Sequence, residues 1–363
     1  AVLTVADQHY LNFAGNDYLG LSQSEAVLQS YVEGLSLYGS SSSASPLVCG
    51  YYQEHQRLEE TFASYIGQDD ALLFSSGFAA NKAICAALFG KHSNQGHILA
   101  DKLMHASFIE GAVASQANFS RFAHNDINHC QTKLASMQGD ILIATEGVFS
   151  MDGDIAELDA LAKLAQQHPS RPWLMVDDAH ALGILGEHGL GSSEFFHNTK
   201  IDIVMATFGK ALGVNGAVVA GSHDLIDYLR NVAGHYVYST GFSPAQARAV
   251  HTSLLQMING HERHQLAANI EYFRSLCVQK NIPVSPSHTP IQLVLIGAND
   301  ALLKAFSKLK SLGIWVGAIR PPTVPANSAR LRITLSALHS QQDIDALSDA
   351  LCLALAPDDM HSV

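Results

Sequence analysis

Cysteine is scarce in this sequence. Its 363 residues include five cysteines, which lie far apart and form no C-x-x-C pair. An odd number of dispersed cysteines suits neither a disulfide scaffold nor a zinc site. None of the 19 histidines forms the H-x-x-x-H pattern with a nearby carboxylate that metalloproteases use. We therefore expect a reducing, cytoplasmic setting and no metal centre.

Positive charge and long apolar runs are lacking as well. The chain has 21 Lys and Arg against 33 Asp and Glu, a formal net charge of -12. Without a basic stripe to neutralise phosphates, a nucleic-acid partner is not expected. No apolar run approaches the roughly 18 residues of a membrane-spanning helix. The first residues also lack the basic segment and apolar core of a signal peptide, so no membrane partner is expected.

What the sequence has is length and apolar content. With 47% hydrophobic residues, 363 residues can form a large domain and a smaller one. Strand and helix patterns alternate through the first two thirds, which predicts an α/β fold with a mostly parallel sheet. Near Pro244 the pattern changes to a smaller α+β domain. The expected division is an N-terminal segment (1–38) packing on the C-terminal domain, a large domain (39–243) and a small C-terminal domain (244–363).

Two buried strands organise the large domain. The strands Trp173–Val176 and Ile201–Ala206 are followed by polar residues that include Asp177, His180 and Lys210. In an open α/β sheet, ligands bind at the carboxyl ends of the strands. A lysine there can form a Schiff base with an aldehyde, and a neighbouring carboxylate can keep a pyridine nitrogen protonated. The pair favours a pyridoxal phosphate (PLP) enzyme, although an N-capping aspartate and a solvated loop lysine are alternative interpretations of each residue alone.

A second feature is a glycine-containing turn before a helix. Ser76-Gly77-Phe78 follows a short strand and precedes a segment of helical periodicity, Ala79 to Phe89. The N-terminus of a helix presents unpaired N–H groups that can bind a phosphate, although an ordinary strand-to-helix turn is the alternative. The glycines of Gly186–Gly191 do not have the spacing of a dinucleotide fingerprint, which disfavours an NAD oxidoreductase.

Five motifs, taken together and in order, resemble those of the α-oxoamine synthases. These are fold-type I PLP enzymes that condense an amino acid with an acyl thioester. The motifs are Asn16–Gly20, Ser76–Phe78, Thr145–Gly153, Val176–His180 and Thr207–Lys210. The resemblance spans nearly the whole chain and implies an aspartate-aminotransferase-like fold. It departs at Ser40–Ser43, where the family has glycines.

The resemblance implies roles for individual residues. Catalysis would fall to Lys210, which would hold PLP as an aldimine, and to His105, Asp177 and His180. The cofactor would be bound by Gly77, Phe78, His105, Ser150, Asp177, His180, Thr207 and Lys210, with Ser239 and Thr240 reaching the cofactor phosphate of a neighbouring subunit. A homodimer with shared active sites is therefore expected.

The resemblance also suggests the substrates. The runs Ala318–Pro325 and Ala329–Arg332 look most like the family member of the biotin pathway, which joins L-alanine to a pimeloyl thioester of coenzyme A or acyl carrier protein. The substrate-binding residues would be Asn16, His105, Thr323 and Arg332, with Arg332 taking the amino-acid carboxylate. A member that uses glycine and acetyl-CoA is an alternative. A non-catalytic PLP-binding regulator is another, which would need a DNA-binding winged helix, and the sequence has none.

Overall fold

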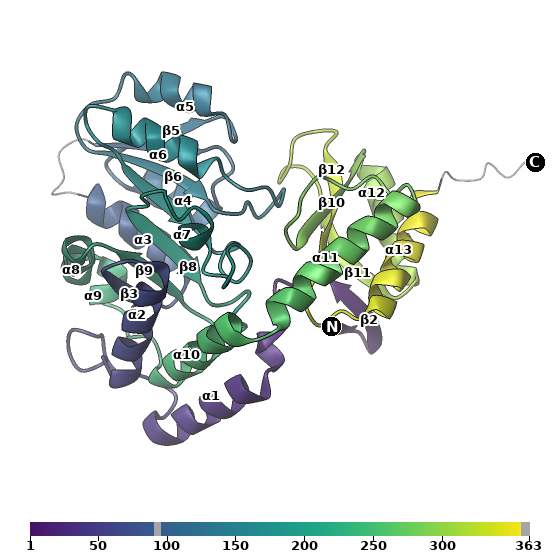
Figure 1. The fold of residues 1–363 in the computed structure, drawn as a ribbon, viewed down its shortest axis with the longest axis horizontal. Helices are drawn as coiled ribbons and strands as arrows, with labels where there is room; N and C mark the ends of the chain where they lie inside the picture. The colour runs from purple at the N-terminus through teal and green to yellow at the C-terminus, as the bar shows by residue number, and fades with distance from the viewer. Residues whose placement is uncertain (91–95, 357–363) are drawn as a thin grey trace, which may run out of the picture. The chain divides into compact units, whose positions relative to one another are not determined.

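The chain consists of two compact units. The computed structural model describes residues 1–90 and 96–356. The larger unit comprises Leu21–Ser150 and Ile155–Gly260, and the smaller comprises Ala1–Gly20, Met151–Asp154 and the residues from His261 onward (Figure 1). These boundaries differ from the predicted ones, because the N-terminal segment divides after Gly20 and the later boundary falls at Gly260.

The difference arises from two helices that pack on each other. Helix α1 (Glu25–Tyr38) and helix α10 (Pro244–Asn259) lie side by side in the larger unit, and α10 also packs against α2 (Gln53–Ile66). The approach is close, since a Cβ at Gly34 would lie 2.8 Å from the Cα of Ala245. The contacts group α1 and α10 with the larger unit, because their small-residue faces are buried against each other.

The larger unit is built on a seven-stranded sheet. Its strands run in the order β3-β9-β8-β7-β6-β4-β5, and all neighbours are parallel except β9, which is antiparallel to both β3 and β8. Every residue of β6 and β9 is buried, so both faces of the sheet are covered. The predicted α/β class with a mostly parallel sheet is confirmed. The strands are β3 (Asp70–Phe74), β4 (His97–Asp101), β5 (Asn118–Phe122), β6 (Ile141–Glu146), β7 (Trp173–Asp177), β8 (Ile203–Thr207) and β9 (Ala217–Gly221).

Helices connect these strands and cover the sheet (Figure 1). Several begin at a side chain that accepts a hydrogen bond from the first turn, as Ser76, Asp126 and Ser222 do. At its other end, α2 stops at Gly67, whose φ of 71° is left-handed, as its sequence position predicts. The remaining elements are η1 (Leu21–Gln23), α3 (Gly77–Leu88), α4 (Ala106–Ala114), α5 (Ile127–Leu134), α6 (Leu158–Gln167), α7 (Ser192–Phe195), α8 (His223–Val232) and α9 (Gly234–Val237).

The serine tract at residues 40–43 is anchored in the larger unit by Ser42, while the other three serines are exposed. The Ser42 side chain is fully buried, and its hydroxyl donates a hydrogen bond to the carbonyl oxygen of Gly241 at 2.7 Å. The tract therefore contacts the segment after α9 and is not a flexible linker.

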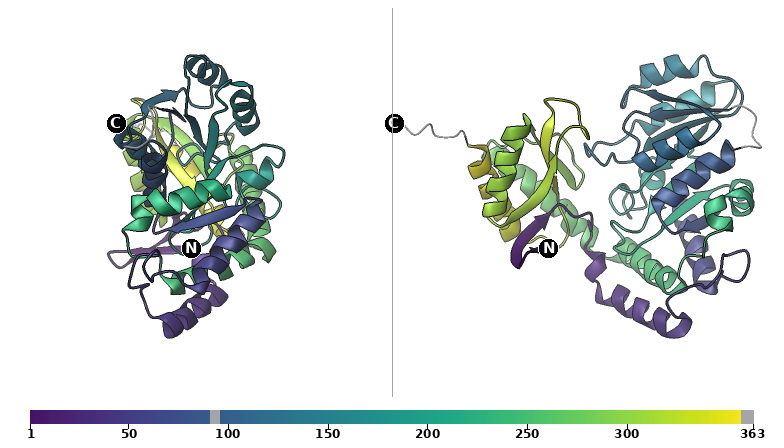
Figure 2. Two further views of the ribbon diagram at one scale, coloured as in Figure 1. Left: turned by 90° about the vertical axis from the view of Figure 1, so that its left-hand side faces the viewer. Right: turned by 180° about the vertical axis from the view of Figure 1, so that it is seen from behind.

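The smaller unit contains a five-stranded sheet in the order β1-β2-β11-β12-β10, with β2 and β11 parallel and the other neighbours antiparallel. Its three helices gather on one side of this sheet (Figure 2). The last helix begins with a capping box, in which Ser340 and Asp343 form reciprocal hydrogen bonds. The elements are β1 (Val2–Val5), β2 (Gln8–Phe13), α11 (Glu262–Gln279), β10 (Ile291–Gly297), α12 (Asn299–Ser311), β11 (Ile314–Ile319), β12 (Ala329–Thr334) and α13 (Gln341–Leu355). No described helix of either unit has the length and apolar character needed to cross a membrane.

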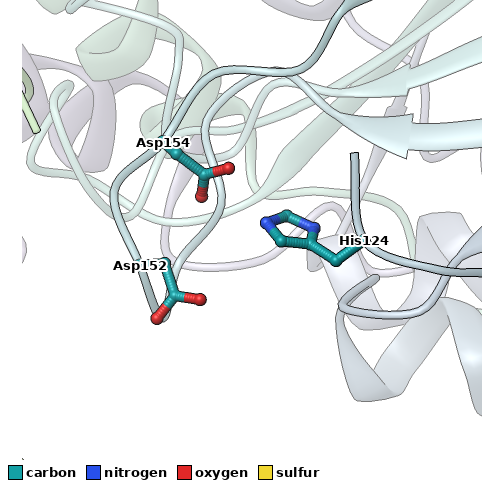
Figure 3. Close-up of side chains that lie close together, drawn as sticks. All are labelled: His124, Asp152 and Asp154. Carbon is teal, nitrogen blue, oxygen red and sulfur yellow. The ribbon is translucent and has the colours of Figure 1, made fainter. Parts of the chain in front are cut away.

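The loop after β6 contributes four residues, Met151–Asp154, to the smaller unit. Figure 3 shows Asp152 and Asp154 on this loop. Asp152 forms an ion pair with Arg330 of β12, and the carbonyl oxygen of Gly153 accepts hydrogen bonds from Ser287 and Thr289. These bonds fasten the loop to the five-stranded sheet. His124, also drawn in Figure 3, belongs to the larger unit, where its Nδ1 lies 3.0 Å from Asp101.

A buried histidine stabilises the smaller unit. His339 stacks on Phe13 with ring centroids 4.0 Å apart, and its Nδ1 accepts a hydrogen bond from the backbone N–H of Ser336. Its Nε2 therefore carries the proton and donates to the carbonyl oxygen of Asn12 at 2.9 Å. Burial lowers the pKa of His339 to about 4.

This depressed pKa predicts acid sensitivity. As the pH falls, His339 takes up a proton near pH 6.5 in the unfolded chain and only near pH 4 in the folded chain. The contribution of His339 to the free energy of unfolding is therefore present above pH 6.5 and is lost as the pH falls towards 4. The loss amounts to about 3 kcal/mol at most. His339→Gln, which keeps a donor and an acceptor, should flatten the pH dependence of urea unfolding in this window. The exposed His288→Gln should not, and an unchanged slope for His339→Gln would contradict the assignment.

Candidate active site

Two buried carboxyl groups lie side by side at the carboxyl ends of neighbouring strands. Strand register places Glu146 of β6 opposite Asp177 of β7, and Asp177 opposite Met205 of β8. A cavity of about 140 Å³ opens at this edge of the sheet. It is lined by Gly77, Phe78, Asn81, His105, Ser107, Glu146, Asp177, Ala179, His180, Met205, Thr207 and Lys210, all of the larger unit. The strand-end position that the sequence predicted is therefore where the structure gathers the polar groups.

Asp177 is held by hydrogen bonds on both oxygens. It is 3% exposed, its Oδ1 accepts from the backbone N–H of Ala179, and its Oδ2 accepts from the side-chain amide of Asn81, each at 3.0 Å. The same amide nitrogen of Asn81 lies 3.0 Å from the hydroxyl of Ser107. These donors stabilise the carboxylate in a buried place and fix its orientation.

The N-terminus of α3 forms another wall of the cavity. Ser76 caps the helix by accepting from the backbone N–H of Ala79, and Gly77 and Phe78 follow it in the first turn. The first N–H groups of a helix have no acceptor within the helix, so they are available to an anion. Gly77 also lies against β8, where a Cβ would come 2.6 Å from the Cγ2 of Thr207. A glycine is therefore required for this close approach.

Glu146 is a second buried carboxyl group in the cavity wall. Burial raises its pKa well above the ordinary value, and the negative charge of Asp177 raises it further. Its Oε2 accepts a hydrogen bond from the backbone N–H of Ser150 at 3.2 Å, whereas its Oε1 has no hydrogen-bond partner in the described part of the chain. Burial and repulsion between the two carboxylates favour the protonated form of Glu146.

His105 and Lys210 approach the cavity from two loops. His105 caps α4, with its Nδ1 2.8 Å from the Ser107 hydroxyl and accepting from the Ser107 backbone N–H. Lys210 lies in the turn after β8, where its carbonyl oxygen accepts from the backbone N–H of Gly213. The side chain of Asp178 binds Ser192 instead of lining the cavity. Its two carboxylate oxygens accept hydrogen bonds from the backbone N–H and the hydroxyl of Ser192. Burial raises the pKa of Asp178 to about 7.

Some predicted site residues lie outside the cavity lining. Ser150 meets the site through its backbone N–H to Glu146, while Ser239 and Thr240 follow α9 and do not line the cavity in the described chain. Asn16, Thr323 and Arg332 belong to the smaller unit: Thr323 lies in the exposed loop between β11 and β12. Both terminal guanidinium nitrogens of Arg332 lie 3.5 Å from the side-chain oxygen of Asn16.

Arg330 and Arg332 are half-buried and alternate along β12 with Leu331 and Ile333, which are fully buried. Arg330 forms an ion pair with Asp152.

Sequence reasoning missed Asn81, Ser107, Glu146, Ala179 and Met205 as lining residues. For Asn81 a signal exists: it is a polar residue of α3 that lies one turn after Gly77 and thus on the same helical face. Glu146 ends a buried strand beside Asp177, which strand register reveals and spacing does not.

The groups around the cavity fit PLP. A lysine amine can bind an aldehyde, a buried carboxylate can pair with a protonated ring nitrogen, and a helix N-terminus can bind a phosphate. The Oγ1 of Thr207 and the Oδ1 of Asn81 are buried without a hydrogen-bond partner among the residues described. Buried polar atoms in proteins normally have a partner, so a polar ligand is expected here.

Comparisons with known proteins agree with this geometry. The family model of class I and II aminotransferases matches residues 8–351. An 8-amino-7-oxononanoate synthase of Aeromonas salmonicida is 47% identical over 96% of this chain and 87% of that protein. One of Photobacterium profundum is 44% identical over 94% of this chain and 87% of that protein.

Solved structures are similar along nearly the whole chain. The 8-amino-7-oxononanoate synthase of Francisella tularensis is 33% identical, with a TM-score of 0.81 over 95% of this chain and 97% of that one. A PLP-bound serine palmitoyltransferase of S. paucimobilis is 25% identical, with a TM-score of 0.91 over 97% and 89%.

Fold and cavity together define a PLP-dependent enzyme of fold type I. Within the class I and II aminotransferase family, the chain belongs to the 8-amino-7-oxononanoate synthases, which are acyltransferases of biotin biosynthesis.

The close approach at Gly77 yields a prediction. Gly77→Ala should push α3 away from Thr207 and weaken PLP binding by about tenfold or more, because the helix N–H groups move with it. Equilibrium dialysis of PLP and the visible absorbance of the purified protein measure the effect. Gly234→Ala is the matched control, since Gly234 also begins a helix and a Cβ there meets nothing closer than 3.8 Å. Equal PLP affinity of Gly77→Ala and wild type would refute the prediction.

Proposed function

We propose that this enzyme condenses L-alanine with a pimeloyl thioester to give 8-amino-7-oxononanoate, a thiol and CO2. The observation that carries the proposal is the cavity in which Lys210, Asp177 and the N-terminus of α3 converge. The alignment over nearly the full chain with relatives that bear the name of this product supports the choice of substrates. The acyl carrier is coenzyme A or acyl carrier protein.

Each cavity residue has a place in binding PLP under this proposal. Lys210 would hold the aldehyde carbon, Asp177 would pair with the ring nitrogen, and His180 would interact with the phenolic oxygen. The N–H groups of Gly77 and Phe78 would bind the phosphate. His105 would contact the ring, and the hydroxyls of Thr207 and Ser150 would complete the polar surroundings. When bound, PLP supplies an electron sink for the carbon that loses its proton.

Lys210 then acts as the base. Its Nζ would take the proton from the Cα of alanine. The Cα electron pair would form a bond to the thioester carbonyl carbon as the C–S bond breaks, and the sulfur would leave as a thiolate that takes a proton from solvent. The C–C bond to the original carboxylate breaks with release of CO2, and Lys210 returns the proton to Cα. His105 donates a hydrogen bond to the oxygen that gains negative charge during the attack.

Two residues of the smaller unit are assigned to the substrates in this proposal. Two nitrogens of Arg332 point to one side, towards the Asn16 amide, which suits the planar recognition of a carboxylate. Thr323, in an exposed loop, is assigned to the acyl side.

The family acts on an amino acid and an acyl thioester, and its members commonly dimerise. For this chain we propose a homodimer in which Ser239 and Thr240 reach the PLP phosphate of the partner subunit. Tyr238 is 87% exposed and Thr240 is also exposed, which supports a surface that a second copy covers. A cytoplasmic location stays a prediction from sequence.

A thiol-release assay tests the reaction. We expect the fastest thiol release with L-alanine and a pimeloyl thioester, and much slower release with glycine or with acetyl-CoA. Lys210→Ala should abolish turnover, because one amine both binds PLP and moves the Cα proton. If glycine with acetyl-CoA were the faster pair, the proposed substrates would be wrong. An active Lys210→Ala would refute the role of the lysine.

A substitution tests the carboxylate site. Arg332→Lys should raise the KM for alanine by about 10-fold to 100-fold, because a point charge cannot replace a bidentate fork. PLP affinity and the KM for the thioester should change little. Arg330→Lys is the control, because Arg330 pairs with Asp152 on the same strand face. An unchanged alanine KM in Arg332→Lys would remove Arg332 from the site.

A further inference from the structure

A hydrogen-bonded cluster in the smaller unit connects the segment after β12 with the turn that follows β2. The hydroxyl of Ser336 donates to the carbonyl oxygen of Asp17 at 2.7 Å, and the next backbone N–H, of Ala337, donates to the carbonyl oxygen of Tyr18 at 2.8 Å. Ser336 is 7% exposed, so water cannot easily replace these bonds. The two segments are therefore fixed relative to each other.

Asn269 of α11 holds the segment after β12 from the other side. Its side-chain amide, which is 2% exposed, donates to the carbonyl oxygens of Ser336 at 2.9 Å and His339 at 2.8 Å. His339 in turn accepts from the Ser336 N–H and donates to Asn12. One amide thus uses both N–H donors to define the loop that carries Ser336.

The cluster ends at the proposed carboxylate site. Asn16 directly precedes Asp17, and its side-chain oxygen faces both terminal nitrogens of Arg332 at 3.5 Å while accepting from the Tyr18 hydroxyl at 3.4 Å. Arg332 is also held from β12 itself, because it donates to the hydroxyl of Thr334 at 2.9 Å. Since Thr334 lies two residues before Ser336, the same loop fixes the strand of the arginine and the turn of the asparagine.

We propose that Ser336 and Asn269 are positioning residues for the amino-acid carboxylate: they hold Asn16 at Arg332 and so set alanine affinity without contacting alanine. The inference rests on the proposed function, which assigns the carboxylate to Arg332. A guanidinium binds a carboxylate well only when its fork is oriented in advance, and a partner held by a fixed backbone provides that orientation. Loosening the backbone should therefore weaken the binding of alanine and leave the proton transfer at Lys210 unaffected.

Ser336→Ala and Asn269→Ala test the proposal in the PLP-loaded enzyme. Alanine affinity is measured from the change in the visible absorbance of the holoenzyme on titration with alanine, and steady-state kinetics give kcat and both KM values. Loss of one buried hydrogen bond predicts about 3-fold to 10-fold weaker alanine binding in Ser336→Ala, and a larger effect in Asn269→Ala. The kcat at saturating alanine and the KM for the thioester should stay within about twofold of wild type.

Tyr272→Phe is the matched control. Tyr272 lies three residues from Asn269 on α11, and its hydroxyl donates to Asp345 of α13 at 2.7 Å, away from the Asn16 turn. This variant also loses one side-chain hydrogen bond of α11, and alanine affinity should be unchanged. Equal weakening of alanine binding in Tyr272→Phe would overturn the positioning role.

Titration of Arg332→Lys with alanine, under the same conditions, separates the positioning role of Ser336 and Asn269 from the assignment of the carboxylate to Arg332. If Arg332→Lys weakens alanine binding and Ser336→Ala does not, the positioning role falls and the carboxylate assignment stands. If neither weakens it, both fall. Should Asn269→Ala fail to fold, Ser336→Ala decides alone, because it removes one hydroxyl and leaves the side-chain volume nearly unchanged.

Discussion

The larger unit depends on keeping the carboxylate of Asp177 buried at the end of β7. A buried charge is costly unless donors compensate it, and here the Asn81 amide and the Ala179 N–H do so. Asn81 reaches Asp177 because α3 lies close against the sheet, and α3 lies that close because Gly77 has no side chain to meet Thr207. The same contact brings the N-terminus of α3 beside Lys210. One packing constraint thus brings together the groups to which we assign the ring nitrogen, the phosphate and the aldehyde of PLP.

Glu146 and Asp177 show how two neighbouring carboxyl groups can have different surroundings. Both end parallel strands and are buried, but each oxygen of Asp177 accepts a hydrogen bond, whereas among the described residues Glu146 accepts one on Oε2 and none on Oε1. Burial and the charge of Asp177 raise the pKa of Glu146, which favours its protonated form.

In the smaller unit, two arginines of one strand are held by different partners. Its sheet buries Leu331 and Ile333 on one face and presents Arg330 and Arg332 on the other, and each arginine meets a different partner. Asp152 reaches Arg330 on the loop after β6, which is held by bonds from Ser287 and Thr289. The buried cluster of Asn269, Ser336 and His339 connects the turn at Asn16 with β12. These hydrogen bonds hold the two partners in place, so that Arg330 pairs with the carboxylate of Asp152 and Arg332 faces the side-chain amide of Asn16.

The sequence by itself determined much of this protein. Alternating strand and helix patterns predicted the α/β class. The observed ends of α2 at Gly67 and of α13 at Ser340 also lie at residue types that favour helix termini, because such signals are local. The positions of Asp177 and Lys210 after buried strands, together with the motif order, predicted a PLP site. Tertiary structure alone decided that α1 and α10 belong together, that Asn81 and Glu146 line the cavity, and that Asp178 binds Ser192 instead. Those facts depend on strand register and on helix packing between residues far apart in the chain, which no local pattern encodes.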